Sequence, residues 1–331
     1  MEAVFVLVAL LFSSLVILLA VLLVSALACV FRASFAMVFR YGLWLLVLPS
    51  LCILYGWLIG RERCVVKEVE IASPELPAAF DGYRIVQISD LHLRSFQGRP
   101  RSLERMLSKI GELNPDVVMF SGDLVTSSPD EIAPLAGILR GISAPDGVYS
   151  VMGNHDYCPY NRWESASEQA AAIAGVRRWE RELGWRLLDN ENVKLCRGGS
   201  EISLIGVENI SAMPQFPSRG DLSRALEGAD TDFKILLSHD PTFWRQGVLG
   251  ATGIDLTLSG HTHNAQLKLF GWEPSRLFFK ENSGLYSERT DVGVQYLYVN
   301  DGLGETMFPA RIGVPAEITL LSLRRREVPA R

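Results

Sequence analysis

Five short apolar runs, each followed by a residue able to bind a metal ion, set the strongest constraint on the fold of this chain. The runs are rich in β-branched or aliphatic residues and end in Asp, Asn or His. They are YRIVQISD (83–90), PDVVMFSGD (115–123), GVYSVMGNHD (147–156), KILLSHD (234–240) and GIDLTLSGHTH (253–263). Near-continuous apolar runs of this length are typical of strands buried on both faces. Helix-like stretches lie between them, at 101–113 and 164–185, so the pattern indicates an α/β domain.

The histidines concentrate in the tails of these runs. The chain has 5 histidines, and all of them are tail residues: His92, His155, His239, His261 and His263. In α/β folds, ligand sites form where the carboxyl ends of neighbouring strands meet, so we expect the five tails to converge. Histidines clustered with carboxylates indicate a metal site rather than scattered polar residues.

The tails offer seven candidate metal ligands. They are Asp90, His92, Asp123, Asn154, His239, His261 and His263. Imidazole nitrogens combined with oxygen ligands favour Mn, Fe, Zn, Co or Ni over Ca. Seven ligands exceed what one ion with an open position can use, so two divalent ions sharing a carboxylate fit better. Such a pair, ~3.5–4 Å apart, assists displacement at phosphorus.

The order of these motifs resembles the calcineurin-like metallophosphoesterases. The series D-x-H, G-D, G-N-H-D, H and G-H-x-H occurs here in order between residues 83 and 266. The resemblance implies a four-layer αββα sandwich with two central sheets and a binuclear metal centre. It implies one ion on Asp90, His92 and His263, a second on Asn154, His239 and His261, and Asp123 as the bridge. It also implies that His155 stabilises or protonates the leaving-group oxygen and that Asp156 orients His155.

The resemblance extends to a membrane-associated branch of that family. Residues 297–323 and the apolar start are similar to bacterial phosphodiesterases and UDP-2,3-diacylglucosamine pyrophosphatases of this branch. Where the branch has two glycines after the last motif, this chain has Asn264 and Ala265, so Asn264 is a candidate to place its side chain at the substrate. DLVTSSPD and GNHD differ from the corresponding motifs of the Ser/Thr protein phosphatases, which argues against that role.

Two uncharged runs precede the domain. Residues 3–31 carry no charge, and a membrane span needs about 20 apolar residues. A cleaved signal peptide fits poorly because its apolar region is only ~7–15 residues long and follows a basic start. Residues 41–60 form a second run with Trp and Tyr at both ends, so we predict a hairpin of two transmembrane helices. We expect a membrane anchor at 1–63, a linker at 64–80, the metallophosphoesterase domain at 81–325 and a tail at 326–331.

Charge and cysteine content bear on location and partners. Two basic residues lie between the uncharged runs and three follow the second, which favours an inner-membrane protein with a cytoplasmic domain. The 5 cysteines form no evenly spaced disulfide framework, which agrees with that side. The net charge of −5 gives no basic field for nucleic acid. We therefore expect a phosphoester or pyrophosphate substrate, possible lipid linkage and contact with the membrane.

Three functions remain open from the sequence. The first is a membrane-anchored two-metal phosphoesterase, in its specific form acting on UDP-2,3-diacylglucosamine in lipid A synthesis. The second is an exported or broad phosphodiesterase acting on envelope phospholipid, polymer or nucleotide. The third is a non-catalytic metal-binding scaffold, which the retention of all seven ligands and His155 disfavours.

Three weaker signals accompany the motifs. Arg99 or Arg101 is a candidate to contact phosphate, although a solvated loop is the commoner role for such arginines. The aromatic residues of 157–163 either form a wall of the pocket or pack within their loop. Cys158 is expected to be inert rather than nucleophilic.

Overall fold

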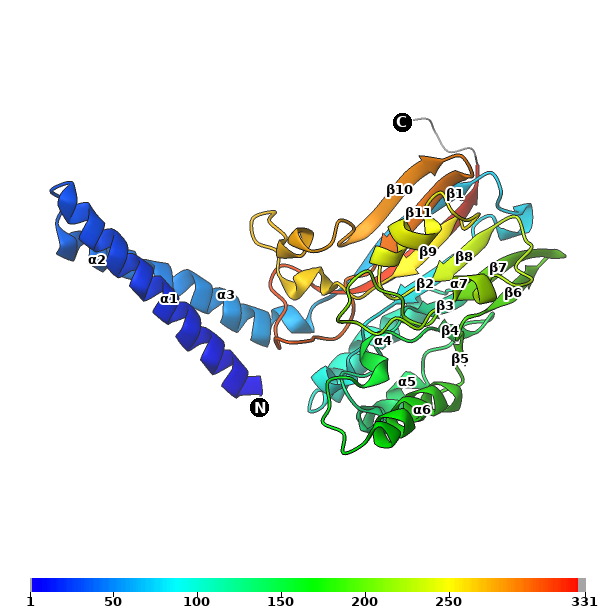
Figure 1. The fold of residues 1–331 in the computed structure, drawn as a ribbon, viewed down its shortest axis with the longest axis horizontal. Helices are drawn as coiled ribbons and strands as arrows, with labels where there is room; N and C mark the ends of the chain where they lie inside the picture. Colours follow the sequence, from blue (N-terminus) through cyan, green and yellow to red (C-terminus); the bar gives the residue numbers. More distant parts are fainter. Residues whose placement is uncertain (1, 327–331) are drawn as a thin grey trace.

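The computed structural model describes residues 2–326, in which a helical hairpin projects from a two-sheet domain (Figure 1). One arm of the hairpin is α1 (Glu2–Val30), and the other is α2 (Phe35–Gly42), a 3₁₀ turn (Leu43–Leu46) and α3 (Val47–Leu58). Both arms are long and apolar enough to cross a membrane, with 18-residue windows of mean hydropathy 3.1 within Glu2–Val30 and 2.0 within Phe35–Glu62. The predicted tail lies outside the described residues from 327 onward.

The second arm begins earlier than the prediction of residues 41–60. Ser34 caps α2, because its side chain accepts a hydrogen bond from the Met37 N–H, and the helix starts at Phe35. Arg40 therefore lies within the second arm rather than in the connection between the arms. The helix therefore contains the predicted span and begins before it, because a cap determines where the helix starts while the predicted span was bounded by the charge of Arg40.

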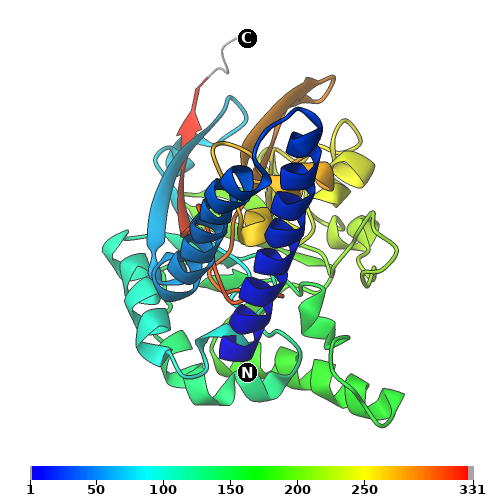
Figure 2. The ribbon, with the colours of Figure 1, turned by 90° about the vertical axis from the view of Figure 1, so that its left-hand side faces the viewer.

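The hairpin rests on the domain through two glycines of its second arm. The Arg311 N–H donates to the Gly56 carbonyl at 3.2 Å. A Cβ on Gly60 would lie 2.0 Å from the Arg311 carbonyl oxygen, so only glycine permits this approach. Figure 2 shows the two arms meeting at their far turn and diverging toward the domain. The end of α3 is thus fixed to the segment around Arg311.

Two six-stranded sheets form the centre of the domain. The first has the order β1 (Cys64–Ser73), β12 (Ala316–Arg325), β2 (Arg84–Ile88), β3 (Val117–Phe120), β4 (Val148–Ser150) and β5 (Arg186–Leu187). The second has the order β10 (Gly284–Thr290), β11 (Gly293–Val299), β9 (Leu256–Ser259), β8 (Lys234–Leu237), β7 (Ser200–Gly206) and β6 (Glu191–Arg197). β2, β3, β4 and β5 are parallel, as are β7, β8, β9 and β11.

Strand β1 corrects the expectation of a linker over 64–80. All ten of its residues pair in parallel with β12, from Cys64 opposite Ala316 to Ser73 opposite Arg325. Apolar and charged residues alternate only over residues 68–71 of this run, so the pattern of a strand is weak. The partner strand lies more than 240 residues away in sequence, so the pairing leaves no local signal.

Helices cover the outer faces of both sheets, which confirms the predicted four-layer αββα fold. The first sheet packs against α4 (Pro100–Glu112), α5 (Ala136–Leu139) and α6 (Ala166–Glu182), and the second against α7 (Leu222–Ala225) and a π-helical turn (Trp244–Val248). Apolar side chains such as Ile85, Met119, Leu237 and Leu258 fill the space between the sheets. This dry core fixes the sheets relative to each other and so positions the residues beyond their strand ends.

Candidate metal centre

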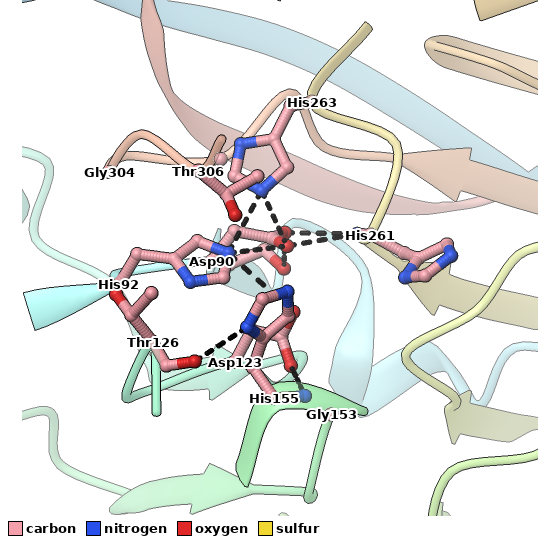
Figure 3. Close-up of polar contacts among 12 residues, drawn as sticks. Asp90, His92, Asp123, Thr126, Gly153, His155, His261, His263, Gly304 and Thr306 are labelled. Carbon is pink, nitrogen blue, oxygen red and sulfur yellow. Dashed lines mark hydrogen bonds and ion pairs between the residues drawn. The ribbon is translucent and has the colours of Figure 1, made fainter. Parts of the chain in front are cut away.

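The strand-end residues of both sheets meet at one place (Figure 3). In the first sheet, Asp90 follows β2, Asp123 follows β3 and Asn154 follows β4. In the second sheet, His239 follows β8, and His261 and His263 follow β9. Six of the seven predicted ligands are buried, and the His261 side chain is only 5% exposed. The structure thus brings together the tails that the sequence placed after separate strands.

The backbone at this centre is strained where it delivers the side chains. Asp90, His92 and Asp123 all have left-handed φ values, of 50°, 40° and 61°. Glycine permits the close packing beside them: a Cβ on Gly153 would lie 2.2 Å from Asp123 Oδ1. The strained residues thus lie where several side chains must point into one small volume.

Asp90, His92 and His263 form the first cluster. His92 Nε2 lies 3.0 Å from His263 Nε2, and His263 Nε2 lies 3.2 Å from Asp90 Oδ1. His92 Nε2 lies 3.8 Å from the same Asp90 oxygen. Two imidazole nitrogens and a carboxylate oxygen that face one another in a buried space fit a divalent cation.

Asp123, His239 and His261 form the second cluster, and Asp123 also reaches the first. Asp123 Oδ2 lies 3.1 Å from His239 Nε2 and 3.6 Å from His92 Nε2. His261 Nδ1 lies 3.3 Å from His239 Nε2. One carboxylate oxygen therefore stands between imidazoles of both clusters, as a bridging ligand requires.

Asn154 supplies a side-chain oxygen that accepts no hydrogen bond from any other group within residues 2–326. Its Oδ1 is buried and has no hydrogen-bond partner in that part of the chain. Its Nδ2 lies 3.5 Å from the Tyr160 hydroxyl. A buried amide oxygen without a partner is costly, and coordination to a cation would satisfy it. The donor set as a whole therefore fits divalent metal ions.

The electrostatics of the centre suit cations as well. Burial and the neighbouring His155 hold the pKa of His92 well below its usual range, so His92 is neutral, the form that binds metal. Burial opposes the charge on His239, but Asp123 outweighs it and raises the pKa of His239 to about 10. Burial opposes the charge on Asp123 too, yet His239 keeps the pKa of Asp123 low. A cation entering the second cluster must therefore displace a proton from His239.

His155 is held from its backbone and its ring. Its Nδ1 donates to the Thr126 carbonyl at 2.7 Å, and its backbone N–H donates to Asp123 Oδ1 at 2.8 Å. The ring stacks edge-on against His92, at 4.6 Å between centroids. Figure 3 shows the other ring nitrogen directed toward the clustered carboxylates. This nitrogen therefore faces the same space as the candidate ligands His92 and Asp123.

Asp156 does not have the partner that was predicted for it. Its carboxylate accepts hydrogen bonds from the backbone N–H groups of Asp123 at 2.8 Å, Val125 at 3.1 Å and Gly153 at 2.9 Å. Burial and the Asp123 charge raise the pKa of Asp156 to about 7, while the backbone donors oppose that shift. The Thr126 carbonyl, rather than Asp156, orients His155. The motif does not reveal the contact between His155 and Thr126, because the Thr126 group that makes it is a backbone carbonyl, which every residue carries.

Asn264 also differs from expectation. Its side chain is buried and bound within the domain, where its Oδ1 accepts from Ser275 Oγ at 2.5 Å and from Asn282 Nδ2 at 3.0 Å. Asn264 itself has a φ of 47°, in the left-handed region. It ties residues 275–282 to the loop that carries His263.

Aromatic rings surround the exposed side of the centre. The Tyr160 ring, from the segment 157–163, lies 4.4 Å from the His155 ring. Phe216 and Phe279 lie edge-on to His261, at 4.7 and 5.6 Å. Neither Phe216 nor Phe279 adjoins a metal motif, so no local signal marked them in the sequence. These rings offer flat apolar surfaces to a substrate beside the metal ligands.

The arginine and cysteine expectations have clear outcomes. Arg99 is bound in ion pairs with Glu62 at 2.6 Å and Glu305 at 3.1 Å, so it serves the junction with the hairpin and not a phosphate. Arg101 is exposed. Burial raises the pKa of the Cys158 thiol to about 12, which agrees with an inert cysteine.

Comparison with known proteins places these features in a family. The sequence profile described as calcineurin-like phosphoesterase matches residues 83–265. A transmembrane protein with metallophosphoesterase domain from Danio rerio is 33% identical over 298 residues, covering 87% of this chain and 63% of that protein. The metallophosphoesterase YkuE of Bacillus subtilis is 31% identical over 279 residues, covering 82% and 90%. The Bos taurus transmembrane protein with metallophosphoesterase domain is 31% identical, covering 81% and 59%. This chain thus spans about three fifths of the two transmembrane relatives.

Proposed function

Because this chain belongs to the calcineurin-like phosphoesterase family, we propose that it is a membrane-anchored hydrolase of a phosphodiester or pyrophosphate, dependent on two divalent ions. The position of Asp123 Oδ2 between His239 and His92 carries this proposal, because a shared carboxylate is what a two-ion site needs. The mixed nitrogen and oxygen ligands favour Mn, Fe or Zn. Bound ions of this kind would attract phosphate oxygens and acidify water.

In this proposal, Asp90, His92 and His263 hold one ion, and Asn154, His239 and His261 hold the other. His155 acts on the leaving group. Its Nδ1 proton is committed to the Thr126 carbonyl, so the second ring nitrogen gives a proton to the departing oxygen. Asp156 is a positioning residue, because its three backbone hydrogen bonds join the turn after β3 to the turn after β4. The scaffold alternative is disfavoured by this intact set.

The hairpin supports a substrate linked to lipid. The second apolar arm leads directly into β1 of the domain, and Gly56 and Gly60 hold the end of this arm against residues 310–312. We propose that the hairpin lies in the cell membrane, with the domain on the cytoplasmic side. The basic residues Arg61, Arg63 and Lys67 after the second arm support that orientation. UDP-2,3-diacylglucosamine is a specific candidate of this class, and an exported phosphodiesterase is the alternative that sidedness distinguishes.

Hydrolysis by detergent-purified protein tests the proposal. Metal-free protein would be given Mn²⁺ and either bis(p-nitrophenyl) phosphate or UDP-2,3-diacylglucosamine, with Asp123→Ala as the control. We expect Mn-dependent hydrolysis of the simple diester by the wild type and loss of it in the variant. Release of UMP would assign the lipid A precursor, whereas activity on the simple diester alone would remove it. Inactivity on both with every metal supplied would contradict the proposal.

A further inference from the structure

A cavity of about 480 Å³ lies where the start of α1 meets the domain. Three segments that are distant in sequence form its walls: the first turns of α1, the turns that follow the first two metal motifs, and residues 305–309. Phe5, Met307 and Phe308 supply apolar side chains. Arg94 supplies a positive charge. The cavity therefore combines the surface of a membrane helix with the edge of the metal centre.

One side of the cavity is continuous with the apolar hairpin. Phe5 lies in the first turns of α1 with 56% of its surface exposed, and Met307 is 95% exposed. Figure 2 shows the start of α1 approaching the domain apart from the end of α3. Apolar side chains left this open are stabilised by contact with an apolar ligand or lipid chain, at roughly 25 cal/mol per Å² buried. An acyl or prenyl chain can reach them directly from the bilayer.

The opposite side of the cavity adjoins the catalytic residues. Thr126 lines it, and the carbonyl of this residue holds His155 Nδ1 at 2.7 Å. Thr306 lines it too, and Figure 3 shows Thr306 beside His263 and Asp90. A molecule that fills the cavity from the hairpin side would thus end next to the metal ligands.

The charges of the cavity favour an anionic group. Its two acidic residues are already paired: Arg61 lies 2.9 Å from Glu2 and 3.4 Å from Glu305, and Arg99 lies 3.1 Å from Glu305. Within residues 2–326 the Arg94 side chain is paired with Glu131 at 3.5 Å and is still 58% exposed. A guanidinium in this position can bind phosphate through two parallel hydrogen bonds.

We propose that this cavity binds the apolar chain of a lipid-linked phosphoester, with Arg94 paired with the scissile phosphate of the same lipid. The chain enters beside Phe5 and Met307 and leaves the scissile phosphate at the metal centre. This inference rests on the proposed function, since it names where the substrate of that hydrolase lies. It assigns specificity for lipid to the junction of the hairpin and the domain.

Two substrates in the same detergent micelles test the inference. One is the p-nitrophenyl phosphodiester of dioleoylglycerol, and the other is bis(p-nitrophenyl) phosphate. The measured quantity is the ratio of kcat/KM for the lipid diester to kcat/KM for the simple one. Phe5→Asn and Met307→Asn should each lower this ratio about 10-fold, because each loses one apolar contact with the chain. Arg94→Gln should raise KM for the lipid diester.

Matched controls separate this effect from general damage. Val4 and Phe270 are 62% and 98% exposed and do not line the cavity, so Val4→Asn and Phe270→Asn should keep the wild-type ratio. Arg101→Gln is the control for the arginine. An unchanged ratio in Phe5→Asn and Met307→Asn, or no hydrolysis of the lipid diester beside activity on the simple one, would overturn the inference and leave the hydrolase intact. Inactivity on both diesters would overturn the hydrolase and the inference together.

Discussion

His155 Nδ1 lies 2.7 Å from the carbonyl oxygen of Thr126, so a backbone group fixes the tautomer of the proposed proton donor. A carbonyl oxygen only accepts, and Nδ1 must therefore carry a proton. The other ring nitrogen is therefore the one left to face the metal ligands, while the Asp156 carboxylate binds backbone N–H groups instead.

His155→Ala should keep the metal ions and lose rate, by ~10²–10⁴-fold for a general acid. The loss should be larger for a diester with an alkoxide leaving group than for one releasing p-nitrophenolate, which needs little protonation. Steady-state kinetics on the two substrates, with metal content measured in parallel, check this. Equal losses on both would show that His155 has another role.

Asp156→Asn should lower thermal stability and activity together. The amide retains one oxygen acceptor but presents an N–H₂ group toward backbone N–H donors that now bond to the carboxylate. Leaving a buried donor unsatisfied costs ~1–3 kcal/mol. Thermal unfolding of the metal-free protein measures the effect without catalysis. Wild-type stability in Asp156→Asn would contradict the positioning role.

Asn264→Ala should destabilise the protein more than Asn264→Gly does. Both variants lose the hydrogen bonds to Ser275 and Asn282. Only alanine adds strain at a φ of 47°, of roughly 1–2 kcal/mol for a left-handed residue with a Cβ. Unfolding midpoints of the two variants and the wild type rank these effects. If Asn264 instead acted on substrate, both variants would change KM with little change in stability.

Asp255 should make stability fall as pH rises. Burial raises the pKa of this carboxyl to about 7 from an ordinary value of 3.8. Between these values the folded chain binds more protons than the unfolded chain, so the free energy of unfolding decreases with increasing pH. The contribution is constant above the folded pKa. Asp255→Asn should gain stability relative to wild type more at pH 8 than at pH 5, measured by thermal unfolding. An equal difference at the two pH values would contradict the shift.

The fold and the convergence of the candidate ligands could be predicted because their signals are local. Each metal motif follows its own strand, so Asp90, Asp123 and His261 were recognisable without knowing their partners. Features that depend on the pairing of strands distant in sequence could not be predicted. β1 resembled a linker because its partner β12 comes at the other end of the domain.

Side-chain roles were predictable only where the motif itself fixes the contact. Asn264 was a candidate for contact with substrate, but Ser275 and Asn282 bind it from a loop that carries no motif. Asp156 was assigned to the neighbouring histidine, yet three backbone donors surround it. Arg99 follows the first motif, but Glu62 and Glu305 draw it to the hairpin junction. In each case the hydrogen-bond or ion-pair partner is determined by contacts formed in the folded domain and not by the motif itself.

The number of metal ions bound per chain tests the central claim most directly. Metal-free protein would be loaded with Mn²⁺, freed of excess, and analysed for its elemental metal content beside Asp123→Ala. The wild type should bind two ions per chain, and removal of the shared carboxylate should leave at most one, together with loss of hydrolysis. One ion per fully active wild-type chain, or two ions and full activity in Asp123→Ala, would contradict the bridging role of Asp123.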